Sequence, residues 1–446
     1  MRRTCIIGAG ISGLALAWQI KRQGGNVIVL EQSKFVGGSM RSTRDGDYLA
    51  EEGPNSILID DARIEEFLNS IPGLSNRIVE ASPEAKKRFI VRDGKLHAVP
   101  MGPLSAITTP LWSLGSKLRV LKEAFIKKHE SDAEESVADF VKRRFGKELC
   151  QYAINPLVGG IYAGDPEQLS MRYGFPKIYA LEQNYGGLIK GAIAKLCESK
   201  KNKDRSVKKR IISFEDGIRE LPQKTAEALG EDTHRNVSID KIQKADDGWE
   251  VTYGQTTENF ERLIVTIPAH RIKELPLSDR VHAQINFLET IDYPPVSVLS
   301  LAYKRSDIAH PLDGFGALVP ECEGRKILGV LFPSSLFAQR APDGEVLLTA
   351  FVGGERQPEL ATGDTDALLR MVRVELTQLL GIKGEPTFVH HKHWDKAIPQ
   401  YKLGYGEVLN QIEEFEKHNE GLQLYGNYRT GISVTNCIEA ALNHAI

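Results

Sequence analysis

The chain has 446 residues, a formal net charge of −2 at pH 7 and a hydrophobic fraction of 41%. This length allows a large core and two or three domains, and the nearly balanced charge argues against a nucleic-acid-binding surface over the whole protein. The five cysteines are scattered and form no CxxC pair. This arrangement gives no sign of a disulfide framework or a zinc site, and it favours a reduced, cytoplasmic location.

A strand, a glycine-rich turn and a helix are predicted in the stretch CIIGAGISG, residues 5–13. The three glycines have separate roles in a dinucleotide-binding turn. Gly8 permits the tight turn, Gly10 lets the backbone approach a pyrophosphate, and Gly13 lets the helix pack closely on the strand. The pattern alone is not specific, because ordinary turns also match it.

The residues around this turn strengthen the prediction of a dinucleotide site. The first helical residues, Ile11 and Ser12, offer free N–H groups and the positive end of the helix dipole to phosphates. After the helix, an apolar strand at residues 27–30 ends at Glu31. A β-α-β dinucleotide unit places at this point the carboxylate that accepts hydrogen bonds from the adenosine ribose.

A second glycine-rich region extends the predicted binding path. It comprises VGGSMRST, residues 36–43, and EEGPNS, residues 51–56. Taken alone, these stretches are typical of ordinary loops. In this order they favour a flavin dinucleotide, whose longer ribityl and isoalloxazine arm needs further backbone to line its path. The candidate cofactor-binding residues here are Gly38, Ser39, Arg41, Gly53, Pro54, Asn55 and Ser56.

The region between residues 84 and 130 combines a strand with an interrupted apolar stretch. Residues 86–91 predict the strand, and residues 99–125 mix three prolines with leucines, isoleucine and Trp112. No apolar run approaches the ~20 residues of a membrane-spanning helix. The stretch is therefore either a helical part of the core or an apolar, lysine-flanked surface that enters a lipid headgroup region.

The second half of the chain alternates between helical and strand patterns. A capping box at Ser136 and Asp139 opens an amphipathic helix. Alternating apolar residues between about 275 and 390 predict a mostly antiparallel sheet, and a helix is predicted from Thr365. Strands at residues 237–242, 249–253 and 263–267 return after the inserted helices, which indicates a discontinuous nucleotide domain. Residues 425–446 predict a further strand, a turn and a helix that begins near Ser433.

Several of these motifs resemble one flavoprotein superfamily. GAGISG, VIVLEQS, VGGSMRST and EEGPNS, in this order, resemble the amino-terminal motifs of the FAD-dependent amine oxidase and desaturase superfamily. Three later motifs resemble those of protoporphyrinogen oxidases: NPLVGGIYAGDP from Asn155, HWDKAIPQY from His393 and YGNYRTGISVTNCIEAA from Tyr425. The resemblance covers almost the whole chain.

The resemblance implies an architecture like that of p-hydroxybenzoate hydroxylase and the amine oxidases, which combines α/β and α+β organisation. We expect a discontinuous Rossmann-like FAD-binding domain at residues 1–85, 206–275 and 391–446. A helical membrane-binding domain is expected at residues 86–205, and a mixed-sheet substrate-binding domain at residues 276–390.

The resemblance also implies an activity, the six-electron oxidation of protoporphyrinogen IX to protoporphyrin IX in haem biosynthesis. FAD would accept hydride and be re-oxidised by O2 or another acceptor. No catalytic residue set is needed, because the cofactor carries the chemistry. The further cofactor contacts implied are Val237, at the adenine end, together with Trp394, Gly426, Ile432, Ser433 and Val434. Of these, the last three begin a helix whose N-terminus could stabilise negative charge on the reduced flavin.

An apolar macrocycle with acidic propionates needs apolar walls and a cation. By position in the matching motifs, Arg88 is expected to pair with a propionate. Leu318, Leu331 and Phe351 are expected to enclose the ring, and Gly160 is expected to allow close backbone approach. Each of these residues could equally be an ordinary surface or strand residue. The resemblance further implies a homodimer and peripheral contact with the inner face of the cell membrane.

Three alternatives remain open. The same chemistry could act on coproporphyrinogen III, whose four propionates could use Lys86, Lys87 and Arg92. An amine oxidase is a second alternative, although members with covalent flavin use a cysteine near the C-terminal flavin motif, and Tyr425-Gly426-Asn427 has none. A flavin-binding interaction protein without turnover is the third. A metal site at His390, His391 and His393 is disfavoured, because neighbouring strand residues point to opposite faces.

Overall fold

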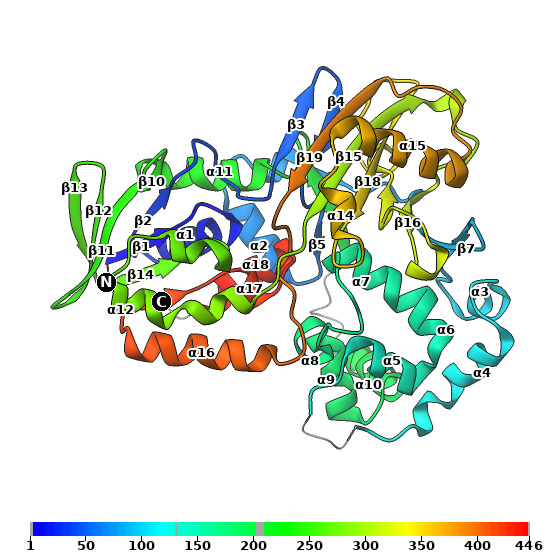
Figure 1. Cartoon of the computed structure of the whole chain (residues 1–446), viewed down its shortest axis with the longest axis horizontal. Helices are drawn as coiled ribbons and strands as arrows, with labels where there is room; N and C mark the ends of the chain where they lie inside the picture. The colour runs from blue at the N-terminus through cyan, green and yellow to red at the C-terminus, as the bar shows by residue number, and fades with distance from the viewer. Residues whose placement is uncertain (1–2, 130–132, 202–208, 445–446) are drawn as a thin grey trace.

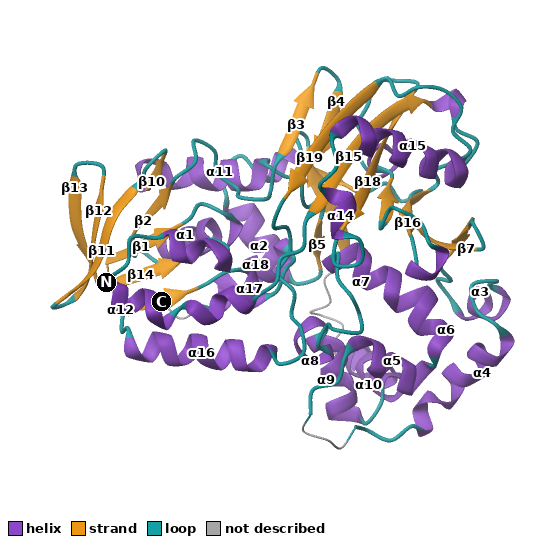
Figure 2. Ribbon diagram, viewed as in Figure 1, coloured by secondary structure: helices purple, strands orange, loops and turns teal. Residues whose placement is uncertain are grey.

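The structure is a computed structural model of the full chain, and it describes residues 3–129, 133–201 and 209–444. Two large sheets and a group of helices make up most of it (Figures 1 and 2). We call the two large sheets the parallel sheet and the mixed sheet.

The parallel sheet is assembled from separated parts of the chain. Its strand order is β10 (Thr233–Arg235), β2 (Asn26–Glu31), β1 (Arg3–Ile7), β14 (Arg262–Val265) and β20 (Leu422–Leu424), and every neighbouring pair is parallel. Buried residues run almost without interruption along β1 and β2, as expected for strands that are covered on both faces. The predicted discontinuous nucleotide-binding sheet is therefore present.

Different elements cover the two faces of the parallel sheet. One face packs against α1 (Ile11–Arg22), α2 (Ala62–Ser70), α11 (Glu220–Leu229) and α18 (Val434–Asn443). The other packs against α16 (Tyr405–His418) and the antiparallel strands β11 (Ile239–Ala245), β12 (Gly248–Tyr253) and β13 (Thr256–Phe260). Helices α1 and α18 contact each other, so the blue and red ends of the colour scale meet in Figure 1.

The mixed sheet forms the second large layer. Its strand order is β19 (Phe388–Trp394), β15 (Val296–Lys304), β18 (Glu345–Gly353), β17 (Gly329–Leu331), β16 (Gly314–Leu318), β7 (Lys87–Arg92) and β8 (Lys95–Ala98). Only β16 and β7 run parallel among these paired strands. Helix α15 (Thr365–Leu380) covers one face, and its buried residues join Leu299, Val330 and Ala350 in one core.

Two expected domain boundaries differ from this pairing. The boundary at residue 86 would place β7 and β8 in the helical domain, and the boundary at residue 391 would divide β19. Both strands pair with strands far away in the sequence, β7 with β16 and β19 with β15. A local sequence pattern does not reveal such long-range pairing. The remaining domain boundaries stay predictions.

The helices between residues 103 and 201 gather beneath the mixed sheet in Figures 1 and 2. They are α3 (Pro103–Thr108), α4 (Leu114–Lys122), α5 (Val137–Phe145), α6 (Lys147–Leu149), α7 (Asn155–Tyr162), α8 (Met171–Gly174), α9 (Pro176–Tyr185) and α10 (Leu188–Lys201). The predicted cap of α5 is confirmed, because the Ser136 hydroxyl accepts a hydrogen bond from the Asp139 N–H at 3.0 Å. Within the described ranges, none of the helices combines the length and apolar character needed to cross a bilayer.

Shorter elements connect these layers. The strands are β3 (Ser42–Asp45), β4 (Tyr48–Glu51), β5 (Ile57–Ile59), β6 (Ile78–Glu80) and β9 (Arg210–Phe214), and the helices are α12 (Asp279–Gln284), α13 (Pro333–Leu336), α14 (Pro358–Ala361) and α17 (Asn427–Thr430). The strand predicted at residues 237–242 begins two residues later, because β11 starts at Ile239 after β10 ends at Arg235 and Asn236 adopts a φ of 58°. Val237 therefore lies in a turn between β10 and β11.

Candidate active site

The glycine-rich turn lies at the point where the strand order of the parallel sheet reverses. From β1 the chain continues to β2 and β10 on one side, and later adds β14 and β20 on the other. Open α/β sheets bind ligands at the carboxyl ends of the strands beside such a point. Gly8 makes the turn with a φ of 108°, and its N–H donates to the Leu30 carbonyl at 2.8 Å.

The other glycines show where the turn is tight and where it is open. A Cβ on Gly13 would overlap the Gly8 carbonyl and lie 2.6 Å from Thr266 Oγ1, so α1 packs closely against the end of β14. A Cβ on Gly10 would meet no atom within 4 Å. The start of α1, whose first N–H groups have no intrahelical acceptor, therefore faces open space, which fits a pyrophosphate.

Glu31 is held at the edge of this open space. Its carboxylate accepts from the Ala9 N–H at 2.8 Å and from the Ser33 N–H at 2.7 Å. The Val237 N–H donates to the Glu31 carbonyl at 3.0 Å. The structure thus brings together the two residues expected at the ribose and at the adenine end.

The two loops of the second glycine-rich region lie side by side. The Glu52 N–H donates to the Arg41 carbonyl at 2.9 Å, and a Cβ on Gly53 would overlap the Ser39 carbonyl. Arg41 Nε donates to the Gly38 carbonyl at 3.1 Å. Pro54, Asn55 and Ser56 follow as half-buried residues.

Asn55 carries an unsatisfied polar atom in this loop. Its Nδ2 donates to the Gly53 carbonyl at 3.0 Å, whereas its buried Oδ1 has no hydrogen-bond partner among the described residues. Buried polar side-chain atoms are usually paired, so the atom marks a place where a ligand group would complete the structure.

Trp394 connects this loop to the mixed sheet. Its Nε1 donates to the Glu52 carbonyl at 2.7 Å. Two cations flank the indole ring: the Arg41 guanidinium lies 5.8 Å from the ring centroid, and Lys392 Nζ lies 4.7 Å from it. The edge strand β19 therefore joins the predicted flavin loop to the predicted substrate sheet.

The pKa values of two adjacent carboxyl groups at this loop, those of Glu51 and Glu52, are shifted in opposite directions. Hydrogen bonds from His390 at 3.2 Å and Thr43 at 2.7 Å outweigh burial and lower the pKa of Glu52 to about 2. Burial raises the pKa of Glu51 to about 7, although Ser42 and the Ile218 N–H donate to its carboxyl. Glu52 is therefore ionised at neutral pH, while Glu51 titrates there.

The start of α18 is the remaining predicted cofactor contact. The Ser433 hydroxyl caps the helix by accepting from the Asn436 N–H at 3.0 Å. In the preceding loop, which includes Ile432, the Gly431 N–H donates to the Tyr401 hydroxyl at 3.1 Å. Gly426 immediately precedes α17, and a Cβ there would lie 2.9 Å from the Tyr428 ring. The N–H groups of Val434 and Thr435 are left for an anionic or electron-rich group.

The predicted substrate residues share one face of the mixed sheet. Leu318 pairs with Gly329, which pairs with Phe351; Leu331 pairs with Gly316, which pairs with Arg88. Directly paired residues point to the same face, and so do residues two apart on one strand. Their neighbours Phe89, Ala317, Val330 and Ala350 point to the opposite face, into the core beneath α15. Leu318, Leu331 and Phe351 remain half-exposed.

Gly160 and Arg88 lie at the ends of this apolar surface. A Cβ on Gly160 would overlap Leu318 Cδ2, so α7 comes close to β16. The Arg88 guanidinium lies 5.2 Å from the Phe315 ring centroid. Among the described residues Arg88 has no ion-pair partner within 4 Å, whereas its neighbour Lys87 pairs with Asp313. Arg88 is therefore available to an anionic group.

Sequence reasoning missed two residues on the same face. His390 pairs with Ser300 and Lys392 with Val298, so both share the face of Trp394. The alternation of His390, Lys392 and Trp394 along one strand could have indicated this. It also missed Thr266, whose hydroxyl donates to the carbonyls of Ile7 and Gly8 at 3.0 and 2.9 Å and fixes the glycine turn.

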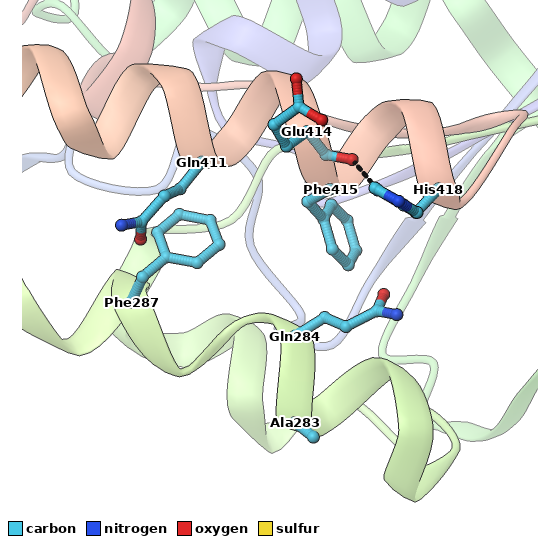
Figure 3. A pocket seen from close by; sticks show the side chains of 7 residues that line it. All are labelled: Ala283, Gln284, Phe287, Gln411, Glu414, Phe415 and His418. Carbon is cyan, nitrogen blue, oxygen red and sulfur yellow. Dashed lines mark hydrogen bonds between the residues drawn. The ribbon is translucent and has the colours of Figure 1, made fainter.

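A separate groove lies between α16 and the helices α12 and Asn286–Thr290, and Figure 3 shows it. It is lined by Ala283, Gln284, Phe287, Gln411, Glu414, Phe415 and His418. None of the predicted site residues lines it. Within the described ranges, no group of three or more His, Cys, Asp or Glu residues is placed to hold a metal ion.

Comparisons with known proteins agree with this geometry. The family model described as flavin containing amine oxidoreductase matches residues 11–445. A mitochondrial protoporphyrinogen oxidase of Nicotiana tabacum is 36% identical, with 100% of this chain and 94% of that protein covered. A coproporphyrinogen III oxidase of Staphylococcus aureus is 28% identical, with 98% and 97% covered. The crystal structure of a protein from Exiguobacterium sp. has a TM-score of 0.78 at 23% identity, with 99% and 97% covered. The chain therefore belongs to the flavin-containing amine oxidoreductases and is an FAD-dependent oxidoreductase.

Proposed function

We propose that this protein oxidises protoporphyrinogen IX to protoporphyrin IX in haem biosynthesis, with O2 as the acceptor. The observation that carries the proposal is the half-exposed face of the mixed sheet, where Leu318, Leu331 and Phe351 lie with Arg88, a cation that has no ion-pair partner among the described residues. This face adjoins the flavin loop through Trp394. The tobacco relative, named as a protoporphyrinogen oxidase, supports the same substrate.

FAD, when bound, supplies the hydride acceptor. We propose that the turn from Gly8 to Gly13 and the start of α1 bind its pyrophosphate, and that Glu31 and Val237 bind the adenosine. The two loops that contain Gly38, Ser39, Arg41 and Gly53 to Ser56 would line the ribityl arm. Trp394, Gly426 and the start of α18, from Ile432 to Val434, would surround the flavin ring, where the helix dipole stabilises negative charge.

The chain itself orients the substrate and excludes water. Leu318, Leu331 and Phe351 would cover the faces of the macrocycle, and Gly160 would let the backbone of α7 approach it. Arg88 would fix the orientation by a charge-assisted hydrogen bond to one propionate. No side chain is assigned the removal of the hydride, since positioning against the flavin supplies the reaction geometry.

Coproporphyrinogen III is the second candidate substrate, and the named Staphylococcus aureus relative favours it. Its four propionates would need more cations than Arg88. Lys87 pairs with Asp313, and Arg92 pairs with Glu148 at 2.8 Å. Two of the three cations expected at the extra propionates, Lys87 and Arg92, are therefore already engaged, which favours the dicarboxylate protoporphyrinogen IX.

A membrane contact is proposed for the apolar face of α3, α4 and the turn Glu123–Phe125. Its large exposed side chains are Met101, Leu104, Ile107, Leu114, Leu118, Leu121 and Phe125. Phe125 is 88% exposed. Contiguous apolar surface with flanking cations is typical of peripheral membrane binding. Attachment to the inner face of the cell membrane, with the protein otherwise in the cytoplasm, and a homodimeric assembly complete the proposal.

One experiment separates the candidate functions. The visible spectrum of the purified protein should show bound flavin, and porphyrin fluorescence should rise faster with protoporphyrinogen IX than with coproporphyrinogen III. Faster oxidation of coproporphyrinogen III would reverse the substrate assignment. Flavin reduction under anaerobic conditions by an amine alone would favour an amine oxidase. Bound flavin that no porphyrinogen and no amine reduces would indicate a binding protein without turnover.

A further inference from the structure

A half-buried arginine joins α7 to the mixed sheet beside the proposed substrate face. Arg356 follows β18, and its guanidinium donates to the Asn155 carbonyl and, at 3.4 Å, to the Val319 carbonyl. Its buried Nε has no acceptor among the described residues. Burial lowers the pKa of Arg356, but a guanidinium stays charged in proteins. The nearby carboxylates of Glu321 and Asp165 oppose this effect of burial. Burial of a charged group is costly unless it is paired and hydrogen-bonded, so the contacts of the guanidinium matter for this region.

Arg356 lies against the glycine that precedes Gly160. A Cβ on Gly159 would be 2.8 Å from one guanidinium nitrogen of Arg356, while a Cβ on Gly160 would overlap Leu318 Cδ2. The two neighbouring glycines therefore face two different partners. Their missing side chains let α7 lie against the arginine and the substrate face at the same time.

Residues that follow β16 and β18 also hold the two ends of α7. At the C-terminal end, the Glu355 N–H donates to the Ala163 carbonyl at 2.8 Å. At the N-terminal end, the Glu321 N–H donates to Asn155 Oδ1 at 2.9 Å, and Asn155 Nδ2 donates back to Glu321 at 3.1 Å. Because Glu321 follows β16 and Glu355 follows β18, the helix is fixed to the strands that carry Leu318 and Phe351.

We infer that Arg356 is a positioning residue that sets the distance between Gly160 on α7 and the substrate face at Leu318 and Phe351. This inference rests on the proposed function, because that face is the proposed porphyrinogen site. Arg356 touches neither the substrate nor the flavin in this arrangement. It acts through the carbonyls of Asn155 and Val319, one on each wall of the site.

The test compares kinetic constants of the FAD-loaded enzyme with protoporphyrinogen IX. Arg356→Met should raise KM about tenfold, because the two walls would no longer be held at a fixed spacing; tenfold corresponds to a loss of about 1.4 kcal/mol of binding free energy. The FAD content and visible spectrum should stay unchanged. Arg356→Lys should restore part of the lost affinity, since an ammonium can still donate to one carbonyl but lacks the fork geometry.

Arg305→Met is the matched control. Arg305 is also half-buried, and its guanidinium donates only to backbone carbonyls, those of Ile308 at 2.8 Å and His310 at 3.0 Å, at the far end of β15. Its loss should lower thermal stability without a change in KM. A KM increase of equal size in Arg305→Met would mean that general loosening, and not positioning, explains the effect.

Gly159→Ala provides an independent test that leaves the arginine in place. The added methyl should displace the guanidinium and raise KM to a similar degree. In the double variant Gly159→Ala/Arg356→Met, the two effects should not multiply, because both act on one contact. If Arg356→Met does not fold, Arg356→Lys and Gly159→Ala still decide the question.

The outcomes separate the inference from the proposed function. Unchanged KM in Arg356→Lys and Gly159→Ala, with an active parent enzyme, would overturn the positioning role alone. A parent enzyme that binds FAD but oxidises no porphyrinogen would overturn the proposed function, and the positioning role would fall with it.

Discussion

Replacement of Glu51 by glutamine should remove a pH-dependent loss of stability. The Glu51 carboxyl is 3% exposed, and burial raises its pKa from 4.5 to about 7. The folded state therefore holds a proton that the unfolded state releases above pH 4.5. Stability from this group is fully present below pH 4.5 and is lost as the pH rises to about 7. Since one pKa unit corresponds to about 1.4 kcal/mol, the loss amounts to about 3 kcal/mol.

Urea unfolding of the FAD-loaded protein between pH 4.5 and 8 measures this effect. The difference in unfolding free energy between Glu51→Gln and the parent should grow by about 3 kcal/mol over this range, because glutamine stays neutral while Glu51 ionises. Glu52→Gln is the control, and its difference from the parent should stay constant between pH 4.5 and 8. The pKa of Glu52 is lowered to about 2, so its stabilising contribution is present above pH 4.5 and is lost only as the pH falls toward 2. A Glu51→Gln difference that does not vary with pH would refute the reasoning.

Three further predictions concern the cofactor, the substrate and the membrane. Gly10→Ala should fold normally and weaken FAD binding, because its Cβ enters the open space proposed for the pyrophosphate, whereas Gly13→Ala should destabilise the protein itself by overlapping the Gly8 carbonyl. Flavin absorbance and thermal unfolding distinguish the two variants. Equal behaviour of the two variants would contradict the assigned roles. Arg88→Ala should raise KM about tenfold, as expected for loss of a charge-assisted hydrogen bond at an exposed site. Phe351→Ala should reduce turnover while FAD stays bound. Unchanged porphyrin fluorescence kinetics in both variants would reject the proposed substrate face. Phe125→Asp should reduce co-sedimentation with anionic vesicles without altering FAD content, and equal sedimentation of variant and parent would exclude this apolar face as the contact.

Local chemistry made several elements of the fold predictable from sequence. The positive φ at Gly8 and the cap at Ser136 depend on residues within a few positions of one another, and both are present in the structure. The strand that ends at Glu31 is equally local, because its burial on both faces requires a continuous apolar run.

Long-range pairing limited the prediction of the substrate side. Arg88 shares a face of the mixed sheet with Leu331 because of the register in which β7 pairs with β16. No pattern within residues 86–91 specifies β16 as the partner strand. The substrate residues came from the family resemblance and not from their own periodicity. Arg356 gave no sequence signal at all, because its contacts with Asn155 and Val319 exist only after α7 packs on the sheet.

The strand order of the parallel sheet has a consequence for biosynthesis. β20 and α18 belong to the last part of the chain, yet β20 pairs with β14, and α18 packs against α1 beside the glycine turn. Chains fold from the N-terminus as they leave the ribosome, so the parallel sheet and the cover of α1 stay incomplete until residues 422–443 have been synthesised. Nascent chains that lack these residues would therefore expose the apolar surface of α1 to chaperones and proteases.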